Sequence, residues 1–399
     1  MKLLFTANRF PYPPYRGDKL KIFHLARILS RHHELHLITF LQDERDRQYL
    51  PELEKYFQKI HIIPLSKTQS YLNCLKAVFS PKPFQTHYFK STAMAEAILK
   101  LHQQEYFEAV HVQHLRMAQY WADINDIPRI LDLPDAYSLY WKRRIKALSG
   151  VQKWFARLEQ KRVYRYEQIL KKYDLTLVCS KEDRQYLATE HQLKNIDILP
   201  NGVDTEAFAG NRHDYQPNQI ILFTGNMDYA PNVDAVIYFS KEIFPVIRQQ
   251  FPDAKFVIAG QRPVKKVLDL AGTAIEVTGF VKDLSALYRR AAIVVAPLRF
   301  GAGTQNKVLE AMAMGVPVVS GAVGFEGLNI QSGEGILLAM STEAFAESCC
   351  RLLADSELRQ RTGETGKTKI RENFAWPVIA QQLESYFNKI ISDRAKNNQ

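Results

Sequence analysis

The sequence predicts an α/β protein of two doubly wound parallel-sheet domains, both Rossmann-like, that face each other across a cleft. Three observations support this fold class. Short apolar segments alternate with helix-forming segments along the chain, as in parallel sheets with right-handed crossovers. Each half opens alike, with KLLFTAN from residue 2 and IILFTGN from residue 220, followed by a loop and a helix. The 399 residues are enough for two domains.

The N-terminal half begins with a strand over residues 2–6 and a proline-containing loop over 8–17. A helix is expected over 19–30, because apolar residues such as Ile22, Ala26 and Leu29 recur at helical spacing. Later strands are expected at residues 34–40, 110–112, 129–133, 175–179 and 196–199. The tripeptide Pro200-Asn201-Gly202 then forms a turn, which indicates a domain boundary.

The C-terminal half repeats the pattern. After the strand that opens near Gln219, further strands are expected at residues 255–259, 274–278, 293–296 and 316–320. Ligands of such sheets bind beyond the carboxyl ends of the strands, so we expect the site in the cleft between the domains.

The segment IVVAPLRFGAGTQNKVLEAMAMGVPVVS, residues 293–320, has the clearest functional pattern. A strand ends at Pro297, a glycine-rich loop follows, and a helix is expected over 307–314, ended by Gly315. The free N–H groups of such a turn and the helix dipole favour a phosphate. Lys307 and Glu310 share a helix face and offer a cation for a diphosphate beside a carboxylate for hydroxyls. The alternative is a tight turn with a solvated Lys–Glu pair.

Composition excludes several protein classes. The apolar fraction of 46% and the charged fraction of 24% are those of a soluble globular protein. No apolar stretch approaches the ~18 residues of a membrane span, and the start MKLLFTANRF is too short for a signal peptide. The four cysteines have neither metal-site spacing nor a disulfide framework, so we expect a cytoplasmic protein.

Much of the net charge of +11 is concentrated in one segment. Residues 142–172 contain eleven Lys or Arg against two Glu, with interleaved aromatic residues. A basic helix of this kind can lie on anionic lipid, which would place the protein at the inner face of the membrane. The alternatives are a solvated helix face and, less favoured, a nucleic-acid footprint; no nucleic acid is expected as a partner.

Several motifs resemble those of retaining glycosyltransferases of family 4. The run LEAMAMGVPVVS resembles the C-terminal signature of that family, and Glu310 matches the second Glu of its E-x7-E motif. PNGVD at 200–204, VTGFV at 277–281 and the opening FPYPPYRGDKLKIFHLARIL occur in family order. Over nearly its whole length the chain resembles the sugar transferases of bacterial exopolysaccharide and exosortase gene clusters, a branch of family 4.

The resemblance implies the two-domain GT-B architecture. Residues 1–195 would form an acceptor-side domain, joined by a crossover helix over 376–395, and residues 196–375 would bind the nucleotide sugar. The implied reaction moves a sugar from a nucleotide-diphosphate sugar to an acceptor hydroxyl, with retained anomeric configuration and without a metal or other cofactor. The acceptor would be lipid-linked or a saccharide, in bacterial exopolysaccharide or glycoconjugate synthesis.

The residues themselves also favour metal-free chemistry. No Asp-x-Asp motif lies at an expected strand end, so Lys, Arg and backbone N–H groups must neutralise the leaving group. The catalytic candidates are Lys307, Glu310, Arg262 and Asp132. The donor-binding candidates are Gly17, Asp18, Gly225, Asn226, Gly279, Phe280, Val281, Arg299, Gly301, Gly303, Thr304, Gln305 and Val308. The acceptor-binding candidates are Arg16, His114 and Asp135. The resemblance would place Glu310 on the ribose hydroxyls.

The chain also departs from the family pattern. An Arg and a Lys usual near the start of the second domain match Asn226 and Pro231, and the first Glu of E-x7-E is replaced by Ala302. The His that commonly contacts the sugar after the fourth N-terminal strand is not evident in residues 131–135.

Two hypotheses follow from these departures. Arg299 or Arg262, with Lys307, would hold the diphosphate, while Asp132 or Asp135 faces the sugar or acceptor. The alternatives are that Asp135 caps a helix and Arg299 is solvated. His114 either contacts the acceptor or is a buried structural histidine.

Two other functions remain open at this point. Nucleotide-sugar 2-epimerases share the architecture but would show different acids and histidines at the cleft. A non-catalytic basic protein that binds lipid or nucleic acid would use residues 142–172.

Overall fold

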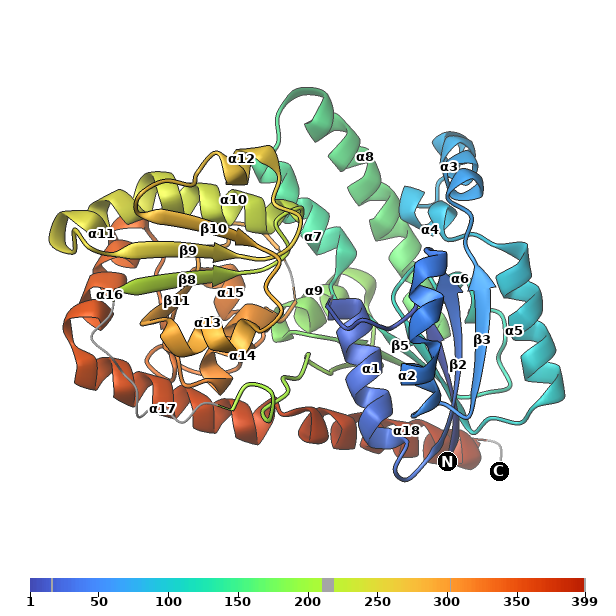
Figure 1. Ribbon diagram of the computed structural model, residues 1–399. Coiled ribbons are helices and arrows are strands. Elements are labelled where there is room, and N and C mark those ends of the chain that lie inside the picture. Colours follow the sequence, from blue (N-terminus) through green and yellow to red (C-terminus); the bar gives the residue numbers. More distant parts are fainter. Residues whose placement is uncertain (16, 210–218, 302, 398–399) are drawn as a thin grey trace. The chain divides into compact units, whose positions relative to one another are not determined.

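The computed structural model of the chain describes residues 1–15, 17–209, 219–301 and 303–397. These residues form two compact units (Figure 1). Unit 1 comprises Met1–Asn201 and Ile379–Gln399, and unit 2 comprises Gly202–Val378.

Unit 1 is built on a parallel sheet whose seven described strands have the order β3-β2-β1-β4-β5-β6-β7. The strands are β1 (Lys2–Ala7), β2 (Glu34–Leu41), β3 (Lys59–Pro64), β4 (Ala109–Gln113), β5 (Arg129–Asp132), β6 (Leu175–Val178) and β7 (Ile196–Ile198). The helices of this unit are α1 (Gly17–Leu29), η1 (Glu44–Tyr49), α2 (Leu50–Glu54), α3 (Lys67–Lys76), η2 (Ala77–Phe79), α4 (Phe84–Tyr88), α5 (Thr92–Gln104), α6 (Ala118–Trp121), α7 (Tyr137–Arg144), η3 (Ile145–Ala147), α8 (Gly150–Tyr166), η4 (Glu167–Lys172) and α9 (Lys181–His191).

Unit 2 repeats this plan with six described strands in the order β10-β9-β8-β11-β12-β13, all parallel. The strands are β8 (Ile220–Thr224), β9 (Lys255–Ala259), β10 (Ile275–Gly279), β11 (Ile293–Ala296), β12 (Val318–Ser320) and β13 (Ile336–Leu338). The helices are α10 (Ala230–Tyr238), η5 (Phe239–Ile243), α11 (Phe244–Gln250), α12 (Lys265–Leu268), α13 (Leu284–Arg290), α14 (Asn306–Ala313), α15 (Ala322–Phe325), α16 (Thr342–Ala354) and α17 (Ser356–Asn373). The last helix is α18 (Trp376–Asn397).

The expected fold class is confirmed, because both sheets are parallel and covered on both faces (Figure 1). Strand β8 shows how one strand serves two cores. Phe223 packs with α10, α11 and α16 on one face, whereas its neighbour Leu222 packs with α13, α14 and α17 on the other. Alternate side chains of a strand point to opposite faces, so a continuous apolar run fits a sheet buried on both sides.

Two strands were not expected from the sequence. These are β3, with the sequence KIHIIP, and β13, with only three residues. Both are edge strands of their sheets. An edge strand is covered on fewer sides, so its apolar pattern is weaker than that of a central strand.

The boundary between the units lies six residues later than the expected start of the second domain at residue 196. Strand β7 pairs with β6 and so belongs to the first sheet. The chain enters unit 2 at Gly202, where a Cβ atom would lie 2.6 Å from the Trp376 ring. From Ile379 onward α18 packs on unit 1, for example through the Tyr386 hydroxyl, which donates to the Ile198 carbonyl at 3.0 Å.

Helix α14, which carries Lys307 and Glu310, ends as the sequence predicts. Gly315 has φ +69°, and its N–H donates to the Met312 carbonyl at 2.8 Å. The next N–H, of Val316, donates to the Ala311 carbonyl at 2.8 Å. These two bonds form a Schellman motif, for which glycine is preferred. The motif stops the helix after two turns and directs the chain into β12.

Candidate functional site

The carboxyl ends of β8, β9 and β10 are joined through glycine backbone. The N–H of Gly225 donates to the Ala259 carbonyl, and that of Gly260 to the Gly279 carbonyl, both at 3.0 Å. A Cβ atom on Gly260 would lie 1.7 Å from the Gly225 carbonyl oxygen. Only glycine therefore fits at position 260, and Gly225 and Gly260 are held at one edge of the sheet. The sequence analysis included Gly225 and Gly279 but missed Gly260.

Lys307 is buried at the start of α14, with only 7% of its surface exposed. Its Nζ donates to Asn232 Oδ1 at 3.1 Å and to Gln305 Oε1 at 3.4 Å, and lies 4.9 Å from the centre of the Phe223 ring. These partners are neutral, so no described carboxylate forms an ion pair with this ammonium. Burial lowers the pKa of Lys307 to about 8.

Glu310 is held one turn further along the same helix. Its Oε2 accepts a hydrogen bond of 2.8 Å from the Tyr288 hydroxyl, which also contacts Thr224 Oγ1 at 2.7 Å. Burial raises the pKa of Glu310 to about 7, although the Tyr288 hydrogen bond and the Lys307 charge both act to lower it.

The alternative of a solvated Lys–Glu pair is wrong. Lys307 is directed to Asn232 and Gln305, and Glu310 to Tyr288, and no ion pair joins the two side chains within the described residues. A desolvated cation with neutral partners gains most from an incoming anion, because no protein carboxylate already neutralises it. Asn232 and Tyr288 were not predicted as site residues from the sequence. Asn232 directly follows Pro231, one of the two positions at which the chain departs from the family pattern.

In the loop before α14, two glycines adopt positive φ angles, as expected for a glycine-rich turn. Gly301 has φ +149° and Gly303 has φ +70°, both disfavoured for other residues. Gln305 is the N-cap residue of α14 but makes no capping hydrogen bond through its side chain. Thr304 and Val308 are buried, and Val308 packs in the core with α13 and α17. Ala302 lies outside the described residues.

The two arginine candidates of unit 2 differ. Arg299 is paired with both oxygens of Asp234 and stacks over the Tyr238 ring of α10, so its charge is already neutralised. This ion pair disfavours Arg299 as a free ligand of the diphosphate, but the side chain is 55% exposed, so the alternative of a solvated arginine is consistent with the structure. Arg262, by contrast, is exposed and makes only a 3.5 Å contact with Asp228. Its φ of +58° is unusual for arginine and places it in a strained turn after β9.

The remaining donor candidates of unit 2 lie around the same strand ends. Asn226 follows β8; its side-chain oxygen accepts from Gln261 at 2.8 Å, and its carbonyl accepts from Asn232 at 3.0 Å. Phe280 follows Gly279 at the end of β10 and is exposed, whereas Val281 packs against the core that holds α14.

In unit 1, His114 directly follows β4 in a conformation that is rare for histidine, with φ +80°. Its ring is buried against Tyr137, whose hydroxyl contacts His114 Nε2. Burial, together with nearby Arg116 and Arg9, holds the pKa of His114 well below its usual value, so the ring is neutral. Backbone strain of this kind occurs often at functional sites, while burial and the Tyr137 contact also fit a structural histidine, so both alternatives for His114 stay open.

The strand count bears on the histidine that is usual after the fourth strand. The fourth strand of unit 1 is β4, because the unexpected strand β3 precedes it in the chain. Residues 131–135 therefore end and follow the fifth strand, β5, and contain no histidine, whereas the residue directly after the fourth strand is His114.

Asp135 lies beyond the end of β5, near His114. It does not cap α7, whose N-cap residue is Ala136, so the capping alternative is wrong. Burial and the neighbouring Asp183 raise the pKa of Asp135 to about 7, while Arg143 and Arg116 act to lower it. No described residue donates a hydrogen bond to its carboxylate. The sequence analysis missed Arg9, Arg116 and Tyr137, which complete this cluster.

Asp132 is placed differently from the expectation that it faces a substrate. It is 1% exposed; its Oδ1 accepts from Lys21 Nζ at 2.7 Å, and its Oδ2 contacts His111 Nε2 at 3.1 Å. Lys21 also donates to the Leu199 carbonyl at 2.8 Å and so ties α1 to the ends of β5 and β7. The contacts favour a structural role, which the sequence could not show because Lys21 is distant in the chain.

The other unit 1 candidates lie at the start of α1. Gly17 is the first residue of α1, and Asp18 follows it. The Asp18 carboxylate contacts Arg9 at 3.6 Å, and its carbonyl accepts from the Gln113 side chain at 2.6 Å. Arg16 lies outside the described residues.

The basic segment 142–172 is not one continuous helix. It comprises the end of α7, then η3, α8 and η4, with a break before Gly150, which has φ +54°. Its basic residues do not form one surface either, since Arg162 is buried and donates to the Val78 carbonyl at 2.9 Å.

The described residues contain no helix that is both long and apolar enough to cross a membrane. They also contain no group of three or more His, Cys, Asp or Glu side chains placed to hold a metal ion.

Comparison with known proteins agrees with this architecture. Residues 22–207 match the family described as Glycosyltransferase Family 4, and residues 218–355 match Glycosyl transferases group 1. An uncharacterized 44.6 kDa protein in the cps region of Klebsiella pneumoniae is 24% identical over 366 residues, covering 87% of this chain and 89% of that protein.

Solved structures share the fold at low identity. Sucrose-phosphate synthase from Thermosynechococcus elongatus aligns with a TM-score of 0.73 and 16% identity, covering 98% of this chain and all of that one. The Anabaena protein HepE in complex with UDP-glucose aligns with a TM-score of 0.69 and 14% identity, over 98% of this chain and 100% of that one. The chain therefore belongs to the GT-B glycosyltransferases, with a family 4 domain followed by a group 1 domain.

Proposed function

We propose that this glycosyltransferase moves a sugar from a nucleotide-diphosphate sugar to an acceptor hydroxyl, and that the pair Lys307 and Glu310 holds the donor. The observation that carries the proposal is a buried ammonium with only neutral partners at the start of α14, one turn before a carboxylate held by Tyr288. Such an ammonium attracts an anionic ligand, because no described carboxylate of the protein is paired with it.

The diphosphate would sit against Lys307 and the N–H groups of the loop over residues 301–305. When the acceptor oxygen bonds to the anomeric carbon, the bond from that carbon to the diphosphate oxygen breaks and negative charge develops there. Lys307 and the helix N-terminus would stabilise that charge. Arg262, exposed beside Gly260, would supply a second cation, because Arg299 is already paired with Asp234.

Glu310 would accept hydrogen bonds from the ribose hydroxyls. The Tyr288 hydroxyl engages one carboxylate oxygen, Oε2, which leaves Oε1 for a ligand. Gly279 and the exposed Phe280 would lie near the base.

Unit 1 would contribute the groups that face the transferred sugar and the acceptor. His114 is fixed by Tyr137 and stays neutral, so it can donate or accept a hydrogen bond without adding charge. Asp135, with no hydrogen-bond donor among the described residues, would orient the acceptor hydroxyl. Gly17 and Asp18 would approach the donor from the start of α1, and Arg16 would bind the acceptor.

Retention of anomeric configuration, independence of metal and a cytoplasmic site of action are parts of this proposal. Support for the first two comes from the family match and from cationic side chains beside α14 that can replace a metal. The relative from a cps region supports a role in exopolysaccharide synthesis, with a saccharide or lipid-linked acceptor.

A thermal-shift panel of UDP-, GDP- and ADP-sugars tests the donor site directly. A donor at a hundredfold excess over its dissociation constant stabilises the protein by about 2.7 kcal/mol. We expect one nucleotide series to raise the melting temperature in wild type but not in Lys307→Met. No response to any nucleotide sugar would contradict the proposal.

Turnover distinguishes the transferase from an epimerase. With donor and acceptor present, a transferase releases nucleoside diphosphate and forms a glycoside. A 2-epimerase would instead change the sugar at C2. Persistence of turnover with a chelator, and NMR of the product anomer, test metal independence and retention.

A further inference from the structure

The strongest feature outside the candidate site is an exposed apolar surface on unit 1. Helix α3 is inverted relative to an ordinary surface helix. Its buried side chains are the polar Ser70 and Asn73, whereas Tyr71 and Leu75 point to solvent. Asn73 donates to the Lys90 carbonyl at 2.9 Å, so this orientation is held by a specific contact.

The inversion continues beyond α3. Phe79, at the end of η2, is 95% exposed, and Val78 beside it is also exposed. Phe79 therefore contributes nothing to the core of unit 1. A single exposed apolar side chain is ordinary, but a group of them on one surface indicates an interaction site.

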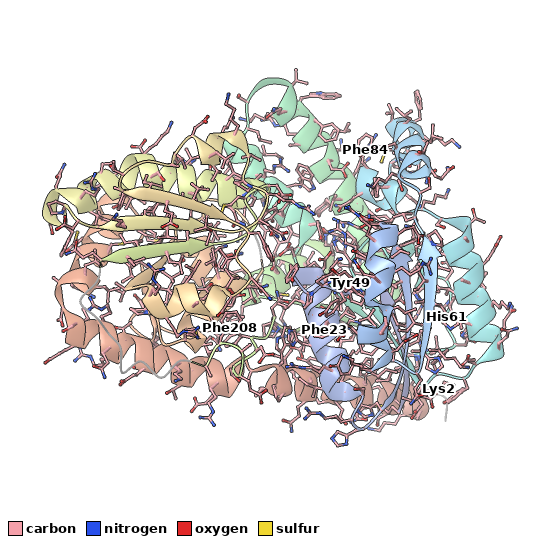
Figure 2. The ribbon with its side chains drawn as sticks, viewed as in Figure 1. Lys2, Phe23, Tyr49, His61, Phe84 and Phe208 are labelled. Atoms are coloured by element: carbon pink, nitrogen blue, oxygen red, sulfur yellow. The ribbon has the colours of Figure 1, made fainter. Side chains whose placement is uncertain are left out.

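The first half of α8 extends the same surface. Glu159 and Arg162 are buried on its inner face, whereas Trp154, 66% exposed, is on its outer face. Helix α8 is joined to this region at two points. Arg162, in the second half of α8, donates to the Val78 carbonyl at 2.9 Å. In the first half, the Phe155 ring lies 5.4 Å from Phe84 of α4, whose carbonyl accepts from Cys74 of α3 at 3.7 Å. Phe84, labelled in Figure 2, lies where α4 meets α8.

We call this set the apolar tip. It comprises Tyr71, Leu72, Leu75, Val78 and Phe79 from α3 and η2, with Val151, Trp154 and Phe155 from α8. In Figure 1, α3 and the start of α8 project from the same end of unit 1.

The charge around the apolar tip has a single sign. From residue 55 to residue 95 the sequence contains no Asp or Glu, and the same holds from residue 136 to residue 158. Four exposed cations in or beside these two segments form no ion pair with a described residue: Lys76, Lys82, Arg157 and Lys161. An ordinary solvated face would intersperse both signs.

We propose that the apolar tip inserts into the interface of an anionic lipid bilayer, while the surrounding Lys and Arg contact its headgroups. Aromatic and aliphatic side chains ringed by cations are the composition of interfacial membrane anchors. A second protein with an acidic, apolar face would match the charge less completely, because tryptophan beside lysine suits the headgroup layer in particular. The surface is distinct from residues 142–172 taken as a whole, since it uses only the start of α8 and adds α3.

The test uses the full chain and needs no nucleotide sugar, so its result is independent of the proposed donor site. Binding is measured by co-sedimentation with vesicles of equimolar phosphatidylglycerol and phosphatidylcholine, and with vesicles of phosphatidylcholine alone. Wild type is expected to bind the anionic vesicles. Leu75→Ser with Phe79→Ser should lower the partition coefficient about tenfold or more, because each removed side chain is otherwise buried in lipid.

Matched control variants carry the same kinds of substitution elsewhere on the protein, and so show whether vesicle binding depends on the location of the changed side chains. Leu99→Ser with Tyr106→Ser removes exposed apolar side chains elsewhere on unit 1 and should bind like wild type. Lys76→Glu with Lys82→Glu should weaken binding by about fivefold for each lysine removed. Lys241→Glu with Lys255→Glu makes the same change of charge on unit 2 and should have little effect.

Fluorescence gives a second readout at the surface itself. Of the four tryptophans, Trp121 and Trp376 are fully buried, Trp141 is partly buried beside Arg144, and Trp154 is exposed. Anionic vesicles should therefore shift the emission to the blue, and Trp154→Phe should abolish most of that shift, whereas Trp141→Phe should retain it.

Four outcomes would overturn the proposal. They are absence of binding by wild type, equal losses in the control variants, binding that responds to charge but not to the apolar substitutions, and a wild-type dimer that Phe79→Ser converts to a monomer. The third would indicate purely electrostatic contact with the headgroups without insertion, and the fourth an interface between copies of the chain.

Discussion

Replacing Lys307 by methionine should separate the function of this residue from its effect on stability. Methionine has a similar length and no charge. Burial lowers the pKa of Lys307 from 10.5 to about 8, which corresponds to roughly 3 kcal/mol of destabilisation of the charged form. Below pH 8 the lysine is protonated in both the folded and the unfolded chain, so the full penalty applies at neutral pH. It disappears as the pH rises from 8 to 10.5.

Part of the stability that Lys307→Met gains by removing the buried charge is offset. The variant loses the hydrogen bonds to Asn232 and Gln305, which together contribute about 1–2 kcal/mol. The contact with the Phe223 ring is retained, because a thioether also packs well against an aromatic ring. The expected net effect at pH 7 is a ligand-free protein more stable than wild type by about 1–2 kcal/mol, or by several degrees in melting temperature.

Donor binding should change in the opposite direction. Loss of the charged hydrogen bonds to the diphosphate should cost about 1.5–3 kcal/mol, which raises the dissociation constant about ten- to a hundredfold. Calorimetric melts with and without the nucleotide sugar measure both quantities in one experiment. A variant that is less stable than wild type and still responds to the donor would refute the reasoning, because Lys307 would then be a structural residue.

Three further predictions test other parts of the molecule. Donor affinity should be greatest between pH 7 and 8, since Glu310 is protonated below its pKa of about 7 and Lys307 is neutral above about 8. In titration calorimetry, the donor affinity of Glu310→Gln should no longer fall below pH 7 but should still fall above pH 8. In melts, Gly260→Ala should destabilise unit 2 by about 3 kcal/mol or more, because its methyl group would overlap the Gly225 carbonyl, whereas Gly272→Ala, with open space around it, should be neutral. Asp132→Asn should cost about 3–5 kcal/mol by leaving Lys21 buried and unpaired, while Asp135→Asn should keep stability and lower turnover; equal effects of these two would contradict their assignment.

The sequence determined the fold class because central parallel strands have a strong local signature. Strands such as β11 were located to the residue, since an apolar β-branched run ended by proline has few other interpretations. The edge strands β3 and β13 were missed, and without β3 the strand count placed the fourth strand at residues 129–133 instead of at β4, which His114 follows. A strand count from sequence is wrong as soon as the strand with the weakest apolar pattern is not detected.

The candidate site divides in the same way. Sequence alone located the glycine turn and identified Lys307 and Glu310, because glycine, a helix start and two charges at helical spacing are local features. Only the tertiary structure decided their partners: Asn232 for Lys307, Tyr288 for Glu310, Lys21 for Asp132 and Asp234 for Arg299. Partners far apart in the chain are brought together by packing, and packing also determines which charges are desolvated and left without a counterion. Local pattern thus predicts which residues can do chemistry, and burial decides which of them remain free to do it.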